Sequence, residues 1–429
     1  MTIDKTFALA FDNHQKNNLE VAESLYNEVL KIDPNHVITH YNLGVIFKKL
    51  GNHQKSIISF EKVIEINPGY IKAYNNLGIA FVFLANYQRG KYYFEKTIEI
   101  NPHHVEALHN LGVILNYLDC PQKAKYYFEK VIEINPNYID AHINLGKTLH
   151  VLGEHSKAFN CFNNALEINP KSTQAYWNLL SYASNIDEAL IVLKKLYKID
   201  KKDIKANIII SALEGCKGNF IRFNDLLDSP ESNHEFTRSI EWVFSLPKLP
   251  KILFNRWDFF DAIIELTDNS RPFYEFGVWN GVSFQYLINT FKRGFGFDTF
   301  SGLPEAWHNE STGTYSSFGS IPKIKGGEFI VGKFEDTLPG FFSKERPMAS
   351  LINFDADLYS STLCALNYSN KVIDEKTILI FDELIMNKNW EQDEFKALND
   401  FCDNLGFDYD VLAISFFTKQ VAVKLKIKK

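Results

Sequence analysis

Apolar and small residues recur at a fixed distance along the first half of the chain. Five prolines stand 34 residues apart, each after an Ile-Asp or Ile-Asn pair: Pro34, Pro68, Pro102, Pro136 and Pro170. The triplet Asn-Leu-Gly keeps the same period and begins at Asn42, Asn76, Asn110 and Asn144. Self-similarity at a period of this length indicates an array of structural repeats, each built from one supersecondary unit.

Two further residue classes keep this register. One class is small: Ala22, Ser56, Gly90, Ala124 and Ala158. The other is aromatic: Tyr26, Phe60, Phe94, Phe128 and Phe162. Small residues let the two helices of a unit cross closely, an aromatic ring fills the space between one unit and the next, and proline ends the second helix. The pattern therefore predicts an α-solenoid of paired helices.

This pattern resembles the tetratricopeptide repeat, and the resemblance covers roughly residues 3–228. After Pro170 the period slips into a shortened unit, and residues 203–228 are expected to form the terminal cap that repeat arrays need. We assign residues 1–228 to the repeat domain.

A column of asparagines follows the repeat period: Asn42, Asn76, Asn110, Asn144 and Asn178. Such positions are expected along the inner curve of the superhelix. Similar asparagine ladders occur in the tetratricopeptide superhelix of O-linked N-acetylglucosamine transferases, where they clamp a peptide backbone. An amide offers both a donor and an acceptor to a main chain of any sequence. The column predicts binding of a protein or peptide partner; the alternative is hydrogen bonding between neighbouring repeats.

Apolar runs of strand length alternate with helical patterns from Arg271 onward, which favours a mostly parallel sheet. The predicted strands are PFYEFGV, RGFGFDTF, GGEFIVG, MASLINFDAD, KTILIFDE, FDYDVLAIS and KQVAVKL. Helices are expected at 280–291, 361–374 and 390–405. The last two strands are joined by a short loop and should pair antiparallel. Seven strands ending in a hairpin are the order of class I S-adenosylmethionine-dependent methyltransferases, which have a Rossmann-like fold.

A polar, turn-rich stretch at residues 228–236 marks the boundary between the two halves. We assign residues 229–270 to a linker and a bridging helix, with an amphipathic helix around 255–267. Residues 271–429 form the predicted methyltransferase domain.

The turn after the first predicted strand contains Gly277 and Gly281. A dinucleotide fingerprint G-x-G-x-x-G needs three glycines, and Trp279 and Ser283 stand where two of them would fall. The resemblance of the strand order to class I methyltransferases implies S-adenosylmethionine as the cofactor, and Gly277 and Gly281 would let the backbone come close to it. Glu275 is positioned to accept a bond from its ammonium group.

Three more carboxylates are expected around this cofactor. Asp298 ends the second strand and suits both ribose hydroxyls, although an acid at this place is shared with NAD-binding folds. Glu335 and Asp336 follow the third strand and are expected near the adenine.

Four carboxylates end the next two strands: Asp355, Asp357, Asp382 and Glu383. Adjacent strand ends of an open α/β sheet face one crevice, where these groups would repel one another unless they share a cation or a proton. Oxygen ligands alone suit Mg²⁺. The alternative is that some of them cap the following helices.

The motifs YEFGVWNGVS, GFDTFSGLPE, GKFEDTLPGF, INFDADLYSST and ILIFDEL occur in this order. Together they resemble the macrocin O-methyltransferase family, which methylates sugar hydroxyls on macrolide antibiotics. The resemblance covers roughly residues 271–425 and implies S-adenosylmethionine, a divalent metal and a hydroxyl acceptor on a glycan or glycosylated small molecule. Carried over by motif, Asp355 and Asp382 match metal ligands. The second member of the pair after the fifth strand is usually Asp and is Glu383 here.

The catalytic base is not settled by the motifs. His308 is the only histidine beyond residue 240 and is one candidate; Asp355 is the other. A sugar hydroxyl bound to a metal needs only a nearby acceptor for its proton.

Composition narrows the partners and the compartment. A net charge of −6 gives no reason to expect nucleic acid. Five dispersed cysteines argue against disulfides, and neither a signal core nor a membrane-spanning run is present, so a cytoplasmic location is predicted.

Two other functions stay open at this stage. The domain could methylate a peptide or protein delivered by the repeat groove, or the chain could be an adaptor with a decayed methyltransferase domain. Decay is disfavoured because Glu275, Gly277, Asp298, Asp355 and Asp382 are all present.

Overall fold

The computed structural model describes residues 2–118, 120–308, 310–317 and 319–428 of the 429-residue chain. The chain divides into two compact units, Met1–Asn178 and Leu179–Lys429. The predicted boundary near residue 228 does not coincide with this division, because the helices that follow the last regular repeat join the second unit.

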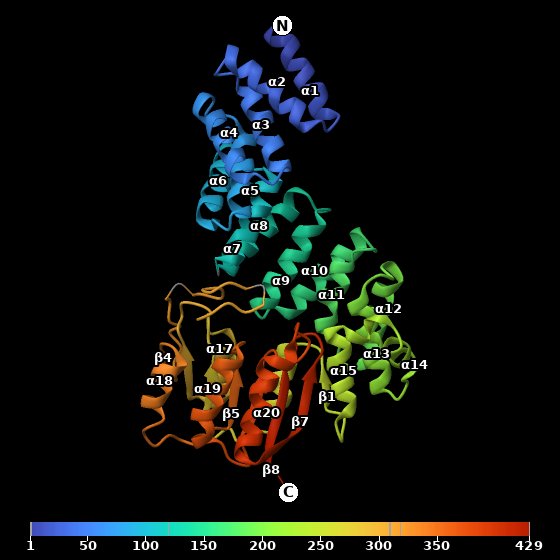
Figure 1. Ribbon diagram of the computed structural model, residues 1–429, viewed down its shortest axis with the longest axis vertical. Coiled ribbons are helices and arrows are strands. Elements are labelled where there is room, and N and C mark those ends of the chain that lie inside the picture. Colours follow the sequence, from blue (N-terminus) through green and yellow to red (C-terminus); the bar gives the residue numbers. More distant parts are fainter. Residues whose placement is uncertain (1, 119, 309, 318, 429) are drawn as a thin grey trace. The chain divides into compact units, whose positions relative to one another are not determined.

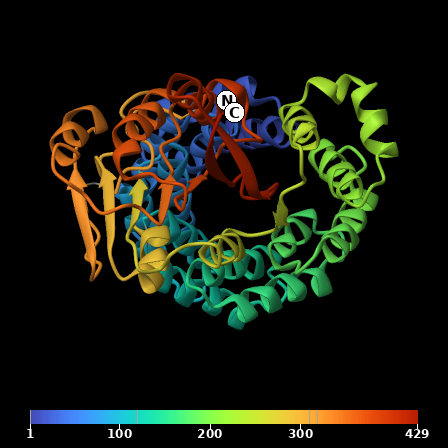
Figure 2. The ribbon, with the colours of Figure 1, turned by 90° about the horizontal axis from the view of Figure 1, so that it is seen from below.

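The first unit is a succession of paired helices, drawn from blue to green in Figure 1 and seen from another side in Figure 2. Its helices are α1 Ile3–Gln15, α2 Leu19–Ile32, α3 Val37–Lys49, α4 His53–Ile66, α5 Ile71–Phe83, α6 Tyr87–Ile100, α7 Val105–Tyr117, α8 Pro121–Ile134, α9 Ile139–Val151, α10 His155–Ile168 and α11 Thr173–Leu179. The predicted α-solenoid is confirmed for this half of the chain.

The residue before each periodic proline ends the second helix of its repeat. Its side-chain oxygen accepts a hydrogen bond of 3.0 to 3.2 Å from the backbone N–H two residues further on. The five residues are Asp33, Asn67, Asn101, Asn135 and Asn169. This Asx turn competes with a further helical turn and leads the chain into the next repeat. The Ile-Asn-Pro signal is thereby explained.

The periodic glycine and the periodic aromatic residue of one repeat lie against each other. A Cβ atom added to the glycine would stand 2.6 or 2.7 Å from the phenylalanine ring, at Gly44, Gly78, Gly112 and Gly146. The rings of Phe60, Phe94, Phe128 and Phe162 are fully buried. The ring therefore packs within its own repeat, and Phe60 also shares a core cluster with Leu77 of the following repeat.

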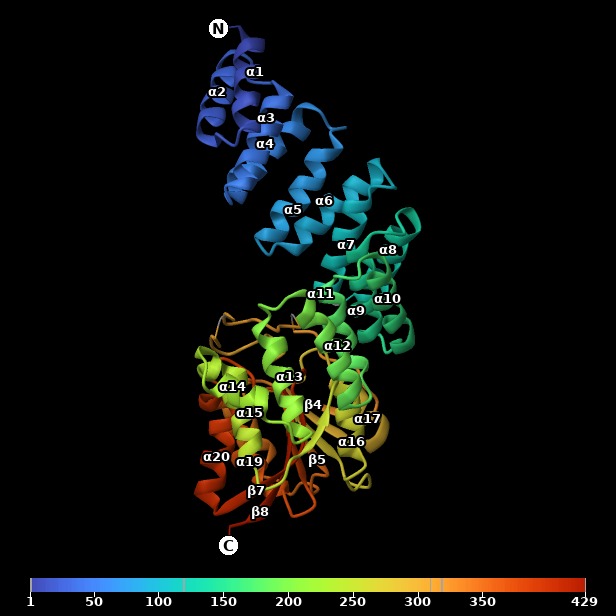
Figure 3. The ribbon, with the colours of Figure 1, turned by 90° about the vertical axis from the view of Figure 1, so that its right-hand side faces the viewer.

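The second unit begins with a helical segment. Its elements are η1 Leu180–Tyr182, α12 Ile186–Ile199, α13 Ile204–Cys216, α14 Ile221–Leu227, η2 Pro230–Asn233 and α15 Glu235–Ser245. Helix α15 packs against the segment that follows the fifth predicted strand, which includes α20 Glu394–Leu405. The rings of Trp242 in α15 and Phe395 in α20 have centroids 5.3 Å apart, and Figure 3 shows the two helices side by side. Arg238 donates to Glu391 (Nε to Oε1, 2.6 Å), and Ser239 Oγ accepts from the Met386 amide at 2.9 Å. These contacts explain why this segment belongs to the second unit.

An eight-stranded mixed sheet forms the centre of the second unit. Its strands are β1 Lys251–Leu253, β2 Phe273–Phe276, β3 Gly294–Asp298, β4 Gly327–Val331, β5 Leu351–Phe354, β6 Ile378–Phe381, β7 Phe407–Ser415 and β8 Val421–Ile427. The order across the sheet is β1-β7-β8-β6-β5-β2-β3-β4. Strand β8 is antiparallel to both of its neighbours, and the other pairs are parallel.

All seven predicted strands are present, and the final hairpin is antiparallel as predicted. Strand β1 was not predicted; it is three residues long and pairs with β7 at the edge of the sheet. The remaining helices are α16 Arg256–Ile264, α17 Val282–Phe291, α18 Phe334–Phe341, α19 Tyr359–Ser369, η3 Asn370–Val372, η4 Trp390–Gln392 and α20 Glu394–Leu405.

Helices cover both faces of the sheet. Side chains of α16 and α17, including Phe260 and Phe284, share one core cluster with strand residues such as Phe273. On the opposite face, Phe341 of α18 packs edge-on against Phe297, with ring centroids 4.9 Å apart. The unit is thus a layered α/β fold in which the central strands β2, β5 and β6 are fully buried. Over the described residues, the structure contains no helix with the length and apolar character needed to span a bilayer.

Candidate functional site

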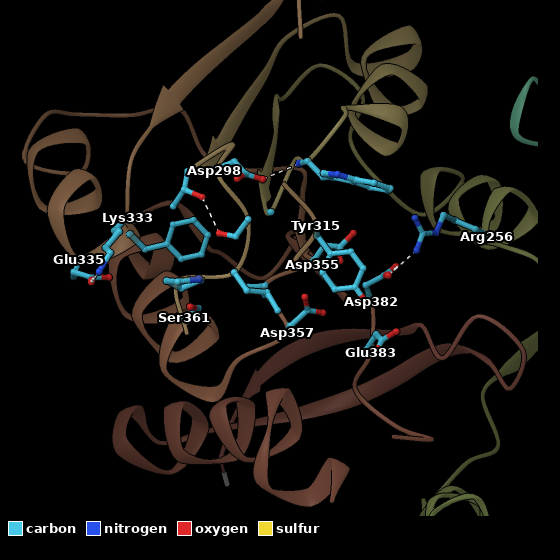
Figure 4. A pocket seen from close by; sticks show the side chains of 18 residues that line it. Arg256, Asp298, Tyr315, Lys333, Glu335, Asp355, Asp357, Ser361, Asp382 and Glu383 are labelled. Atoms are coloured by element: carbon cyan, nitrogen blue, oxygen red, sulfur yellow. Dashed lines mark hydrogen bonds and ion pairs between the residues drawn. The ribbon is translucent and has the colours of Figure 1, made fainter. Parts of the chain in front are cut away.

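A cavity of about 270 Å³ opens at the carboxyl ends of the central strands of the second unit. Six carboxylates line it, from the ends of β3, β5 and β6 and from α18: Asp298, Glu335, Asp355, Asp357, Asp382 and Glu383. Two cations also line it, Arg256 and Lys333, and Figure 4 shows them on opposite sides of the cavity. Parallel strands end at the same edge of the sheet, which explains why residues so distant in sequence meet here.

The glycine turn after β2 forms one wall of this cavity. Gly277 has φ of +89°, and a Cβ atom added there would lie 1.8 Å from the carbonyl oxygen of Asp355. Only glycine combines this backbone conformation with so close an approach of two chain segments. Gly281 has φ of +79° and precedes α17, but it does not line the cavity.

The carboxylate of Asp298 is bound to the glycine turn. Its Oδ2 accepts from the backbone N–H groups of Val278 at 2.8 Å and Trp279 at 2.7 Å, and its Oδ1 accepts from Phe300 N–H at 2.6 Å. In dinucleotide-binding folds, the amides of the corresponding turn bind the pyrophosphate of the cofactor. In this chain those amides donate to a carboxylate instead. Asp298 lines the cavity as predicted for a ribose contact, and it has a structural role that the sequence did not indicate.

Glu275 lies in the protein core and not in the cavity lining. Its side chain is fully buried, and its Oε1 accepts a hydrogen bond from Ser283 Oγ at 2.6 Å. Among the described residues, its Oε2 has no hydrogen-bond partner. Burial raises the pKa of Glu275 to about 8, so the carboxyl group is largely protonated at neutral pH. Glu275 thus does not line the cavity, and its contact with the cofactor's ammonium group stays a prediction.

The buried carboxyl of Glu275 should make stability depend on pH. The folded state keeps this proton up to about pH 8, whereas the usual glutamate pKa is 4.5. Between these values, rising pH favours the unfolded state by roughly 1.4 kcal/mol per pH unit. Glu275→Gln should remove this slope, so that the variant is more stable than the wild type at pH 8 and similar to it at pH 4.5.

Urea unfolding followed by tryptophan fluorescence measures this slope, because five of the six tryptophans belong to the second unit. Glu335→Gln is the matched control, since that side chain is 66% exposed and its substitution should leave the slope unchanged. Parallel stability curves for the wild type and Glu275→Gln would contradict the prediction.

Two aspartates after β5 stand in the centre of the carboxylate group. Burial, followed by the charge of Asp382, raises the pKa of Asp355 well above its usual range. Burial together with Glu383 raises the pKa of Asp357 to about 7. Both shifts favour the protonated form of these aspartates, and protonation lessens the repulsion among the carboxylates. Neither of the two is an N-cap, because α19 begins at Tyr359 after Leu358.

The two acids after β6 have partners from this chain. Asp382 accepts from Arg256 Nη2 at 2.6 Å and from Gln420 Nε2 at 2.8 Å. Glu383 accepts from Lys419 Nζ at 3.1 Å and from Asn387 Nδ2 at 2.7 Å. Arginine and lysine thus supply positive charge where a metal ion was predicted.

Magnesium was predicted at Asp355, Asp382 and Glu383. Within the described ranges, no three acidic, histidine or cysteine side chains are grouped so that they could hold a metal ion. The donor atoms are oxygens, as Mg²⁺ prefers, but their placement does not fit a metal site. The binding of magnesium therefore stays a prediction.

Other predicted residues lie elsewhere. His308 Nε2 lies 2.8 Å from Asp393 Oδ2, and its ring is adjacent to that of Trp307; it does not line the cavity. Glu335 lines the cavity, whereas Asp336, the next residue of α18, is exposed and does not.

Among the lining residues that were not predicted from the sequence are Arg256, Trp279 and Tyr315. Arg256 begins α16, far from the motifs, and only its proximity to Asp382 reveals it. Trp279 and Tyr315 have φ of +47° and +61° and are exposed by 45% and 46%, with ring centroids 6.2 Å apart. A non-glycine residue with positive φ is uncommon, and no sequence motif indicates this conformation at either position.

The asparagine column of the first unit is bonded within the solenoid at several positions. Asn76 accepts from Lys48 Nζ at 2.6 Å, and Asn144 Nδ2 lies 2.9 Å from His109 Nε2, both across neighbouring repeats. Asn178 donates to the backbone of Gln174 in its own helix. Asn42 is buried, and Asn110 lines a groove of about 320 Å³ with Ile79 and Val113.

Family comparison identifies the repeats. Models of the tetratricopeptide repeat match residues 37–70, 71–104, 105–138 and 139–172. These matches share the 34-residue register read from the prolines, and they confirm that the first unit is built from tetratricopeptide repeats. This family assignment indicates a protein-interaction role for that half of the chain.

Solved structures similar to this chain include repeat proteins. The MamA protein has 26% identity and a TM-score of 0.38, covering 40% of this chain and 94% of that one. PilF of Pseudomonas aeruginosa has 19% identity and a TM-score of 0.42, covering 47% and 93%. YrrB, described as a tetratricopeptide protein with an unusual peptide-binding site, has 22% identity and a TM-score of 0.37, covering 42% and 95%. The search of curated proteins gave no match.

Proposed function

We propose that the second unit is an S-adenosylmethionine-dependent O-methyltransferase that acts on a sugar hydroxyl of a glycan or glycosylated product. The observation that carries this proposal is the acidic lining of the cavity, with the turn amides of Val278 and Trp279 bound to Asp298. The order of the seven strands from β4 to β7, which is that of class I methyltransferases, supports it further.

The charge of the cavity distinguishes between two classes of cofactor. A nicotinamide dinucleotide carries a pyrophosphate, which needs free N–H donors and positive charge at the glycine turn. Here a carboxylate occupies those donors, and six carboxylates stand against two cations. S-adenosylmethionine has a positive sulfonium and an ammonium group, so the same lining attracts it.

The lining also suits the adenosine part of this cofactor. Leu303, Pro304 and Phe334 offer apolar surface for an adenine ring, and Glu335 offers an acceptor for its exocyclic amine. The carboxylate of Asp298 can still accept from a ribose hydroxyl, since each of its oxygens has more than one acceptor position. The close contact at Gly277 keeps this part of the wall free of side chains.

Asp357 is the best-placed proton acceptor for the transfer. When bound, S-adenosylmethionine supplies an electrophilic methyl group on its sulfonium. The acceptor hydroxyl must lose a proton as it attacks, and a base with a pKa near the working pH is most effective. Asp357 lines the cavity and has a pKa of about 7, whereas burial and the charge of Asp382 raise the pKa of Asp355 well above its usual range. We therefore assign the base to Asp357 in place of His308 or Asp355.

The tetratricopeptide unit would recruit the acceptor or a protein partner. Its groove beside Asn110 combines the apolar side chains of Ile79 and Val113 with one amide. Such a lining suits an extended peptide segment, because the amide can bond a main chain while the apolar surface takes a side chain.

Calorimetry tests the cofactor assignment. The full-length protein should bind S-adenosylhomocysteine and should not bind NAD. Asp298→Ala should weaken S-adenosylhomocysteine binding by about 1–3 kcal/mol, because a hydrogen-bonding carboxylate and the turn it holds are both lost. Glu328→Gln, an exposed carboxylate outside the cavity, is the control and should bind as the wild type does. Tight binding of NAD would overturn the assignment.

A further inference from the structure

Arg256 is held in the cavity wall by its surroundings. The residue before it, Asn255, caps α16 by accepting from Asp258 N–H at 2.8 Å and donates to the backbone oxygen of Ser181 at 2.9 Å. The guanidinium donates from Nη2 to Asp382 Oδ2 at 2.6 Å. Its Nε and Nη1 make no hydrogen bond or ion pair within the described part of the chain. Arg256 therefore keeps donors available on the cavity side.

The charge pattern of the cavity gives this cation a specific partner. The only anionic group of S-adenosylmethionine is its carboxylate, and an acidic lining repels it everywhere except near a cation. The cavity cations among the described residues are Arg256 and Lys333. Lys333 is 53% exposed, lies 3.7 Å from Glu335, and stands on the far side of the cavity from Arg256 in Figure 4. That side has the apolar residue Phe334, which suits adenine, so the amino-acid end of the cofactor points toward Arg256.

We propose that the guanidinium of Arg256 binds the carboxylate of the methionine part of S-adenosylmethionine. This inference rests on the proposed function and deepens it. A guanidinium can bond two carboxylates at once through different N–H groups. Asp382 keeps it oriented, and the capping contacts of Asn255 fix the start of its helix. Arg256 is thus a cofactor-binding residue supplied by the bridging segment and not by the methyltransferase motifs.

Two ligands separate this role from a structural one. S-adenosylhomocysteine has the carboxylate, whereas 5′-methylthioadenosine has the same nucleoside and thioether without the amino-acid end. Arg256→Met should lower the affinity for S-adenosylhomocysteine about 10- to 100-fold, the range for a lost charge-assisted hydrogen bond. The affinity for 5′-methylthioadenosine should change less than twofold. Arg256→Lys, which keeps the charge without the fork, should lie between wild type and Arg256→Met for S-adenosylhomocysteine.

Arg238→Met is the matched control. It removes an arginine paired with a carboxylate, Glu391, in the same unit but outside the cavity. It should leave both affinities unchanged. Thermal unfolding of every variant reports whether the unit is folded.

The outcomes are distinct. An equal loss of both ligands in Arg256→Met would mean that Arg256 acts through the fold and would overturn the inference. Unchanged binding of S-adenosylhomocysteine would overturn it as well, while leaving the proposed function intact. Failure of the wild-type protein to bind either ligand would overturn the proposed function itself.

Discussion

Replacing Gly277 with alanine should destabilise the second unit by about 4 kcal/mol or more and abolish binding of S-adenosylhomocysteine. The added Cβ would lie 1.8 Å from the backbone oxygen of Asp355, and φ at this position is +89°. A backbone oxygen cannot move aside as a flexible side chain can. The turn and the end of β5 must therefore separate, and both form the wall of the cavity.

Gly340→Ala is the control for this substitution. Gly340 lies in α18, and no heavy atom stands within 4 Å of the position of an added Cβ. The change should leave stability within about 1 kcal/mol of the wild type, because alanine is the better helix former. Urea unfolding and calorimetry measure both effects. If Gly277→Ala changed stability and binding as little as Gly340→Ala, the close contact between the turn and the end of β5 would be contradicted.

The second large effect is expected in the repeats. Phe128→Ala should lower the free energy of unfolding of the first unit by about 3–5 kcal/mol, through lost burial and the cavity left behind. The ring of Phe128 is fully buried and lies against Gly112, which has no side chain to fill the space. Coupling between neighbouring repeats should weaken at the same point, since each repeat contacts only its neighbours.

Tyr126→Ala provides a matched comparison, because it removes an aromatic ring from the same helix, α8. Tyr126 is 51% exposed, and its loss should change stability by less than about 1 kcal/mol. Helical circular dichroism during thermal unfolding reports the difference. Equal shifts for the two variants would show that the periodic aromatic class does not hold the repeats together.

The repeats were predictable because the contacts that define their helices and turns join residues close together in the sequence. The Asx turn around each periodic proline is made within one 34-residue unit, and so is the contact between Gly112 and Phe128. The central strands β2, β5 and β6 were predictable from a local signal as well, since a strand buried on both faces is a short apolar run.

The cavity was predictable only in part. Most of the carboxylates follow strands, so their place at one edge of the sheet could be predicted from the topology. Arg256 binds Asp382, which is 126 positions away in the sequence, and no sequence pattern predicts that pair. Strand β1 was not predicted for the same reason: its three residues form a strand because they pair with β7, which is distant in sequence. The hydrogen bonds from the turn amides to Asp298 depend on the backbone conformation of the turn, which cannot be predicted from the motif.

The pairing of β1 with β7 has a consequence for the order in which the chain folds during synthesis. The repeats can fold early in synthesis, once a few neighbouring repeats have been made, because their contacts are local. Strand β1 must wait for β7, and β7 and β6 are joined only when β8 has also been made. A message cut short before β8 would therefore yield a folded repeat array joined to an unfinished sheet.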